Sequence, residues 1–231
     1  MGRDAEPISG GTRMNYVPGD LRDQLAHVGY DVVQSGLAVG SGGNLSAREP
    51  DADTCWVTAA GTWLDRLSRS GFVSVGVADG EPVPVPEPYG ARFTRPTSEL
   101  ALHLAVYRAR PDVNAVVHLH PQTVLLLDAL GERIRLVTTD HAFYLRRVAT
   151  VPFRPPGSIE LAGLAAGAVA DGTDCVVLSR HGICVTADSV ELAHKRVRNL
   201  EEAARLTYAA LVAGRSLTDL PDDFLDGLTT V

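Results

Sequence analysis

The segment NAVVHLHP, residues 114–121, sets two histidines two positions apart at the end of an apolar run. Successive side chains on a strand point to opposite faces, so His118 and His120 should project from the same face. Imidazole is the commonest metal ligand in proteins, and two of them side by side are a natural start to a metal site. An isolated H-x-H can also be one core histidine beside one surface histidine, so the rest of the chain has to decide.

Two further residues favour a metal site. His181, in SRHGICV, ends another apolar stretch and precedes Gly182, and catalytic zinc sites commonly use three protein ligands with an open position. Glu99 opens the helix that leads to the two histidines, so its carboxylate should lie near their strand and near a helix N-terminus, where negative charge is favoured. It could bind the metal or carry a proton, although a first-turn glutamate is also common in capping.

Three segments rich in glycine or hydroxyl groups could present N–H donors to an anion: Gly42-Gly43-Asn44, Ala60-Gly61 and Thr97-Ser98. Glycine-rich turns and helix N-termini bind anions in this way. Each segment alone is weak evidence because such turns are common. Beside a metal site, the three together predict an anion pocket of a kind that suits phosphate.

The remaining histidines and the single lysine have ordinary interpretations. His27 and His194 fall in amphipathic helices, and His103, one turn after Glu99, is interpreted as a core or helix-face residue. Lys195 is the only lysine, and it falls among helix formers on a charged stripe. A mechanism that needs a buried Schiff-base lysine is therefore disfavoured, since lysine is seldom buried.

The elements that must position these residues alternate between helix and strand along the chain. Hydrophobic spacing predicts helices, strands and one hairpin, as follows: helices at 18–37, 95–113, 123–131, 158–172 and 189–213; strands at 39–49, 55–61, 114–120, 133–139 and 147–153; a strand pair at 174–187 that turns at His181-Gly182; and a hairpin at 71–87 that turns at Asp79-Gly80. The helix at 95–113 should have Thr97 or Ser98 as its N-cap.

This order of elements predicts an α/β fold, with a mixed, mostly antiparallel central sheet and helices on both faces. The domain prediction is a flexible N-terminal tail at 1–16, one catalytic domain at 17–214 and a C-terminal tail at 215–231. A chain of 231 residues with 45% hydrophobic content is long enough to bury a core.

Composition excludes several classes of function. The net charge of −7 and a pI near 5.4 give no basic face for nucleic acid. No apolar run is as long as a membrane span, and the N-terminal residues have no signal-peptide core. The three cysteines are odd in number and lack C-x-x-C spacing, which favours a reduced, cytoplasmic setting over a disulfide framework.

The order of GSGGNLSAR, VTAAG, RPTSELALHLAVYRARPDVNAVVHLHP and SRHGICV resembles the class II aldolase/adducin family over about residues 20–213. The most specific part is Glu99, the two histidines nineteen and twenty-one residues later, and His-Gly at 181. The family's T-P-[S/T]-G element stands here as T-A-A-G, so a hydroxyl is missing at Ala60, whereas its S-S-E element, as T-S-E, keeps its hydroxyls.

The resemblance implies a single α/β domain, a homotetramer with active sites at subunit interfaces, and one divalent metal ion per chain, with zinc expected. The metal ligands would be His118, His120 and His181, with Glu99 as the general acid/base that can also bind the resting metal. The implied substrate-binding residues are Gly43, Asn44, Ala60, Gly61, Thr97 and Ser98, and the candidates for a second acid/base, in TTDHAFYL, are Asp140, His141 and Tyr144.

The implied activity is that of a metal-dependent aldolase acting on a small ketose. A ketose 1-phosphate would be cleaved to dihydroxyacetone phosphate and an aldehyde through a metal-stabilised enediolate. A sugar-phosphate epimerase, decarboxylase or dehydratase of the same fold remains an alternative, because all would use the same ligands. A non-catalytic, adducin-like interaction domain is a further alternative, disfavoured because the ligands and the base occur together.

Overall fold

Seven strands form one sheet in the order β3-β2-β1-β4-β7-β6-β5. The structure is a computed structural model that describes residues 19–85, 95–221 and 224. Every neighbouring pair of strands is antiparallel except β5 with β6, so the predicted mixed and mostly antiparallel sheet is confirmed. The strands are β1 (Gly43–Ala47), β2 (Thr54–Thr58), β3 (Phe72–Gly76), β4 (Ala115–Leu119), β5 (Val148–Val151), β6 (Cys175–Leu178) and β7 (Gly182–Ala187).

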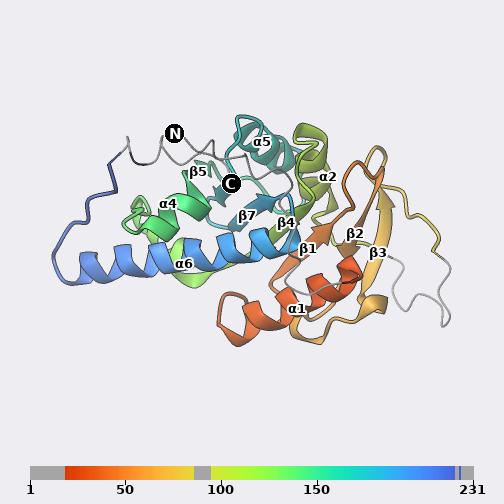
Figure 1. Cartoon of the computed structure of the whole chain (residues 1–231), viewed down its shortest axis with the longest axis horizontal. Helices are drawn as coiled ribbons and strands as arrows, with labels where there is room; N and C mark the ends of the chain where they lie inside the picture. The colour runs from red at the N-terminus through yellow and green to blue at the C-terminus, as the bar shows by residue number, and fades with distance from the viewer. Residues whose placement is uncertain (1–18, 86–94, 222–223, 225–231) are drawn as a thin grey trace, which may run out of the picture.

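Helices cover both faces of the sheet, as predicted (Figure 1). One core lies between the sheet and α1, α3, α4 and α6, and the other between the sheet and α2 and α5. The helices are α1 (Leu21–Gln34), α2 (Leu100–Ala109), α3 (Gln122–Leu130), α4 (Thr139–Leu145), α5 (Ile159–Val169) and α6 (Val190–Val212), with short 3-10 turns η1 (Leu64–Arg66) and η2 (Arg69–Gly71).

Strand β4 lies at the centre of the sheet, between β1 and β7. Its residues alternate between the two cores: Val117 and Leu119 pack on the α6 side, while Val116 packs on the side of α2 and α5. His118, two residues after Val116, therefore points to the α2 side, and it is fully buried. The two helix layers thus decide which residues can approach His118.

Two predicted strand segments are wrong. Residues 133–139 form no strand, because their backbone has partners outside the sheet: the Leu136 N–H donates to the Asp219 carboxylate, and the Leu136 carbonyl accepts from Leu220 N–H. The return arm of the 71–87 hairpin is reduced to one bridge between Val75 and Pro82. Prolines that lack an N–H cannot complete a ladder there, and the end of that range, residues 86–87, lies outside the described residues.

The start of α2 and the whole of α4 also differ from the prediction. The N-cap of α2 is Glu99, rather than Thr97 or Ser98, and it makes no side-chain capping bond. The Thr97 hydroxyl instead accepts from the Glu99 N–H, at 3.3 Å. Helix α4 was not predicted, although Thr138 is its N-cap and its hydroxyl accepts from His141 N–H, which is a recognisable helix start.

The two predicted tails differ in what can be said of them. The N-terminal segment 1–16 lies outside the described residues. Of the C-terminal segment, residues 215–221 are described, and Asp219 and Leu220 bond to the loop before α4 through Arg133, Arg135 and Leu136. Within the part of the chain that the structure describes, no helix combines the length and the apolar character needed to cross a membrane.

Candidate metal centre

The two histidines of the H-x-H segment meet at the end of β4. Their Nε2 atoms lie 3.1 Å apart and their ring centroids 4.9 Å apart, as expected for side chains two positions apart on a strand. The Nδ1–H of His118 donates to the Ile183 carbonyl of β7 at 2.9 Å. This bond leaves the His118 Nε2 lone pair for a ligand, as the second partner of a metal-binding histidine commonly does.

His181 supplies the third imidazole from the turn between β6 and β7. Its ring centroid lies 4.7 Å from that of His118 and 5.2 Å from that of His120. The residue before it, Arg180, has a left-handed backbone with φ of 60°, which costs energy in a residue with a Cβ. Asp128 of α3 stabilises this turn by accepting from the Arg180 N–H at 2.7 Å and from the Ser179 hydroxyl at 3.2 Å.

Two glycines on the neighbouring strands allow the histidines to pack. A Cβ on Gly182 would lie 2.6 Å from the ring of His120 and 3.0 Å from the ring of His118. Gly43, with φ of 119°, would place a Cβ 2.5 Å from the His118 carbonyl oxygen. Both glycines are therefore required by close approach, and neither position could accept alanine without moving the imidazoles or β4.

Glu99 closes the fourth side of the cluster from the N-terminus of α2. Its carboxylate oxygens lie 2.9 Å from Nε2 of His118 and 3.2 Å from Nε2 of His181. The Nδ2 group of Asn44, on β1, donates to the same carboxylate at 3.0 Å. Glu99 is only 7% exposed, so these contacts and the helix N-terminus have to compensate for its lost hydration.

The electrostatics of the cluster favour an ionised Glu99 and neutral rings at His120 and His181. Burial alone would raise the pKa of Glu99, but the close contact with His118, the hydrogen bond from Asn44 and the electrostatic influence of His181 outweigh it and hold that pKa at about 2. Burial and the positive potential of neighbouring histidines lower the pKa of His120 to about 4 and also lower that of His181. Neutral imidazoles beside a carboxylate are the forms that bind a metal ion.

This donor set fits a divalent cation. One ligand atom from each of Glu99, His118, His120 and His181 lies within 4.8 Å of the others. Oε1 of Glu99 is buried and has no hydrogen-bond partner in the described structure, which is costly unless something satisfies it. Three imidazole nitrogens and one carboxylate oxygen also match the ligands and the number that zinc commonly takes. The cluster could therefore hold one metal ion.

The predicted anion-binding segments lie near one another and near Glu99. Residues 58–61 pair with residues 95–97 through the Thr97 N–H to the Thr58 carbonyl and the Ala60 N–H to the Arg95 carbonyl. Ala60, Gly61 and Ser98 are exposed. The Ala60 N–H is thus already engaged, and Asn44 is bonded to Glu99. Substrate binding by Gly43, Asn44, Ala60, Gly61, Thr97 and Ser98 stays a prediction.

The three candidates for a second acid/base are not brought to this cluster within one chain. Asp140, His141 and Tyr144 lie on α4, which packs on α6, on the face of the sheet opposite to α2. His141 is buried and its Nδ1 accepts from Val137 N–H. Asp140 and Tyr144 instead border a surface hollow of about 470 Å³ that Lys195 also lines. The TTDHAFYL segment therefore does not reach the cluster of its own chain.

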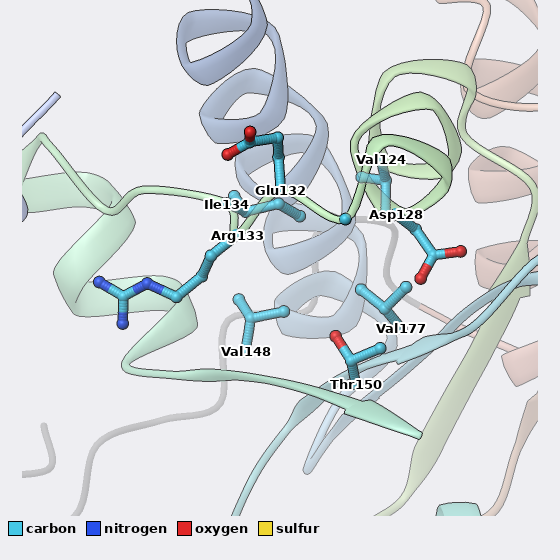
Figure 2. Close-up of a pocket in the computed structure, with 9 residues that line it drawn as sticks. Val124, Asp128, Glu132, Arg133, Ile134, Val148, Thr150 and Val177 are labelled. Carbon is cyan, nitrogen blue, oxygen red and sulfur yellow. The ribbon is translucent and has the colours of Figure 1, made fainter. Parts of the chain in front are cut away.

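A second surface hollow, of about 280 Å³, has Asp128 among the residues that line it (Figure 2). Its walls come from α3, the loop after α3 and strands β5 and β6, through Val124, Val148, Thr150 and Val177 among others. None of the predicted site residues lines it. The hollow is connected to the histidine cluster only through Asp128, which lines it and also stabilises the turn that carries His181.

One part of the site was missed at the sequence level. His103 is a core residue, as one interpretation held, but its ring also bonds to Asn44, the amide that contacts Glu99. The signal was present in the sequence: Glu99, His103 and Tyr107 are spaced four apart, so they share one face of α2. Polar residues repeated along one helix face that is otherwise buried indicate a network.

Comparison with known proteins gives one consistent family. Residues 23–208 match the Class II Aldolase and Adducin N-terminal domain. An L-fuculose phosphate aldolase of Methanococcus vannielii is 29% identical over 194 residues, which cover 83% of this chain and 97% of the relative. A 3-oxo-tetronate 4-phosphate decarboxylase of Escherichia coli strain K12 is 32% identical over 193 residues, covering 81% and 86%. A solved L-fuculose 1-phosphate aldolase has a TM-score of 0.75 at 27% identity, covering 92% of this chain and 96% of that one.

Proposed function

The chain belongs to the class II aldolase and adducin family, and from this premise we propose that it is a divalent-metal-dependent aldolase acting on a small ketose. The favoured substrate class is a ketose 1-phosphate, cleaved to dihydroxyacetone phosphate and an aldehyde or formed from them. The observation that carries the proposal is the position of Glu99, a buried carboxylate within 3.2 Å of two of three clustered imidazoles.

His118, His120 and His181 would hold the metal ion, and Glu99 could complete the set in the resting protein. The bound ion, for which zinc is the expected identity, would supply Lewis-acid stabilisation of the negative charge that develops on the ketose oxygens. The arrangement of the imidazoles supports this role, because β4, β7 and two glycines hold them close together.

Glu99 would carry the proton on and off the substrate carbon. In the cleavage direction, the bond between C3 and C4 of the ketose breaks, and its electron pair stays on the three-carbon fragment as an enediolate. The C4 hydroxyl loses its proton to a second base and becomes the aldehyde carbonyl. Glu99 then delivers a proton to C3, which completes dihydroxyacetone phosphate, and the reverse sequence forms the bond.

The anionic end of the substrate would lie against the paired segments 58–61 and 95–98. The exposed Gly61 and Ser98 and the α2 N-terminus support this placement, because backbone N–H groups and hydroxyls at a helix start bind phosphate. Ala60 leaves this pocket one hydroxyl short of the family's motif. We expect weakened phosphate binding rather than none, since the other donors remain.

Assembly and setting complete the proposal. A homotetramer with active sites between subunits would let Asp140, His141 or Tyr144 of one copy serve the cluster of another, which a single chain does not achieve. A reducing, cytoplasmic setting is supported by the cysteines, because Cys55, Cys175 and Cys184, the whole complement of the chain, are buried and unpaired.

A decarboxylase is the second candidate, favoured by the 32% identity to a 3-oxo-tetronate 4-phosphate decarboxylase. Loss of CO₂ from a 3-oxo acid that carries a hydroxyl on C2 leaves an enediolate like the one left by aldol cleavage, so the same cluster could serve both reactions. Release of an aldehyde from ketose 1-phosphates, set against release of CO₂ from 3-oxo acid phosphates, separates the two. An epimerase would release neither, and would convert one sugar phosphate to another.

Glu99→Gln tests the proposal most directly, with Glu49→Gln, an exposed glutamate in the turn after β1, as the matched control. The Glu99 variant should keep its fold and most of its metal but lose about 10²- to 10⁴-fold in kcat, the usual contribution of a general acid/base. The control should keep wild-type turnover. Near-normal turnover of the Glu99 variant on a substrate that the wild type cleaves would rule out proton transfer by Glu99.

A further inference from the structure

A buried chain of hydrogen bonds runs from the cluster into the core between α2 and β1. Glu99, His103 and Tyr107 are spaced four apart on one face of α2, and Asn44 and Ser46 are two apart on the facing side of β1. The five residues are between 0% and 7% exposed. Apolar side chains could fill this space, so an uninterrupted polar chain here calls for a role.

The contacts in the chain are short and continuous. The Tyr107 hydroxyl lies 2.8 Å from the Ser46 hydroxyl, which lies 2.6 Å from Nδ1 of His103. Nε2 of His103 lies 2.5 Å from Oδ1 of Asn44, whose Nδ2 lies 3.0 Å from Oε2 of Glu99. Every distance is short enough for a hydrogen bond, and the contact between His103 and Asn44 is shorter than is usual for an N–H···O bond.

The direction of every bond follows from the Asn44 amide, whose Nδ2 group donates to Glu99. A carboxylate only accepts, so Asn44 must turn its NH₂ group towards Glu99 and its carbonyl oxygen towards His103. His103 must then donate from Nε2. Burial, followed by the electrostatic influence of His118, lowers the pKa of His103 to about 3. The ring is therefore neutral, and with Nε2 donating, its Nδ1 accepts from Ser46. The Ser46 oxygen in turn accepts from Tyr107.

We propose that His103 is a positioning residue for the acid/base carboxylate: its Nε2–H fixes the orientation of the Asn44 amide, and that amide holds Glu99. The inference rests on the proposed role of Glu99. An asparagine amide can rotate by half a turn at little cost in shape, and the rotated form would present its oxygen to the carboxylate. The Nε2–H of His103 opposes that rotation, and the Nδ1 atom of the same ring keeps a partner in the Ser46 hydroxyl.

Two substitutions of His103 separate positioning from packing. Gln can place an amide N–H near the position of Nε2 and so keep the bond to Asn44. Asn is shorter, reaches only to the region of Nδ1, and so keeps the contact with Ser46 while losing Asn44. Both are uncharged and polar, and both fill less of the core than histidine does. Thermal unfolding and metal content of the full-length variants report whether fold and metal site survive.

We expect His103→Gln to keep kcat within about threefold of wild type and His103→Asn to lower kcat by about ten- to a hundredfold, with KM changed little in both. Such a split follows from loss of a hydrogen bond that serves a charged acceptor. Equal losses in the two variants, or a loss confined to KM, would overturn the positioning role. Absence of activity in the wild type itself would instead refute the proposed function.

A second measurement does not depend on activity. In metal-free wild-type protein labelled with ¹⁵N-histidine, long-range ¹H–¹⁵N spectra at pH 7 distinguish the two neutral tautomers of each ring from the charged form. The His103 signals can be assigned by their loss in either variant, or by sequential assignment if the variants do not fold. They should show a proton on Nε2 and none on Nδ1. A ring protonated on Nδ1, alone or together with Nε2, would overturn the arrangement even if the enzyme is active.

Discussion

Acid should destabilise this protein partly through one residue, His103. The ring is fully buried and its Nδ1 accepts a hydrogen bond from Ser46, so protonation would place an extra charge and an extra donor where neither has a partner. Burial, followed by the electrostatic influence of His118, accordingly lowers the pKa of His103 from 6.5 to about 3. Replacement by Gln removes the titrating group while keeping a side chain that can bond to Asn44.

The sign and the size follow from proton linkage. A histidine whose folded-state pKa is depressed binds fewer protons in the folded chain than in the unfolded chain, so its contribution to stability is retained above pH 6.5 and is lost as the pH falls from 6.5 towards 3. At pH 5.0 the unfolded histidine is about 1.5 pH units below its pKa, which at 1.36 kcal/mol per unit amounts to about 2 kcal/mol. At pH 7.5 this loss of stability is close to zero.

Urea unfolding of wild type and His103→Gln at pH 7.5 and 5.0, with a chelator present, measures this contribution. The contributions of Glu99, with a pKa of about 2, and His120, with a pKa of about 4, to the free energy of unfolding also fall in acid. Both residues are present in wild type and in the variant, so their effects cancel in the comparison. The free energy of unfolding should therefore fall by about 2 kcal/mol more in wild type than in the variant between the two pH values. Parallel losses, equal within about 0.5 kcal/mol, would refute the assignment of a buried, neutral His103.

Three further changes test the metal centre and the anion pocket. Purified wild type should hold about one divalent ion per chain and His118→Ala much less, because too few ligands remain; full occupancy in a variant lacking all three histidines would contradict the site. Gly182→Ala should weaken metal affinity about ten- to a hundredfold, since its Cβ would lie 2.6 Å from the His120 ring, whereas Gly163→Ala, with nothing within 4 Å, should leave that affinity unchanged. Ala60→Ser should lower KM for a phosphorylated ketose; a better kcat/KM for the unphosphorylated sugar in wild type would show that the pocket is not for phosphate.

The approach of the three imidazoles could be predicted from the sequence because it depends on local rules. A strand places side chains two apart on one face, which sets His118 beside His120. The predicted strand pair at 174–187, which turns at His181-Gly182, placed the third ring at a turn. The antiparallel pairing of β4 with β7, in which Leu119 lies opposite Ile183, brings that turn to the histidines. The likeness to a known family added which partners to expect.

The features that could not be predicted from the sequence depend on partners that are distant along the chain. Residues 133–139 have the composition of a strand, yet Leu136 bonds to Asp219 and Leu220, more than eighty residues later. No window of local periodicity contains such a partner. The opposite locations of α2 and α4 were hidden for the same reason, since the face that a helix covers depends on the order of strands in the sheet. The second acid/base was consequently assigned to a segment that a single chain keeps away from Glu99.

His103 shows how a single position can satisfy two interpretations. Spacing on α2 predicts that it is buried, and burial is what the structure has. The same spacing also places it between Glu99 and Tyr107, and only the register of β1 against α2 reveals that Asn44 and Ser46 fill the gaps between them. A neutral, fully bonded ring stabilises the core above pH 6.5 and orients the amide that contacts the carboxylate. Burying these polar side chains costs free energy, and their hydrogen bonds to one another offset that cost. The same bonds orient Glu99, whose carboxylate must face the substrate carbon for the proposed proton transfer.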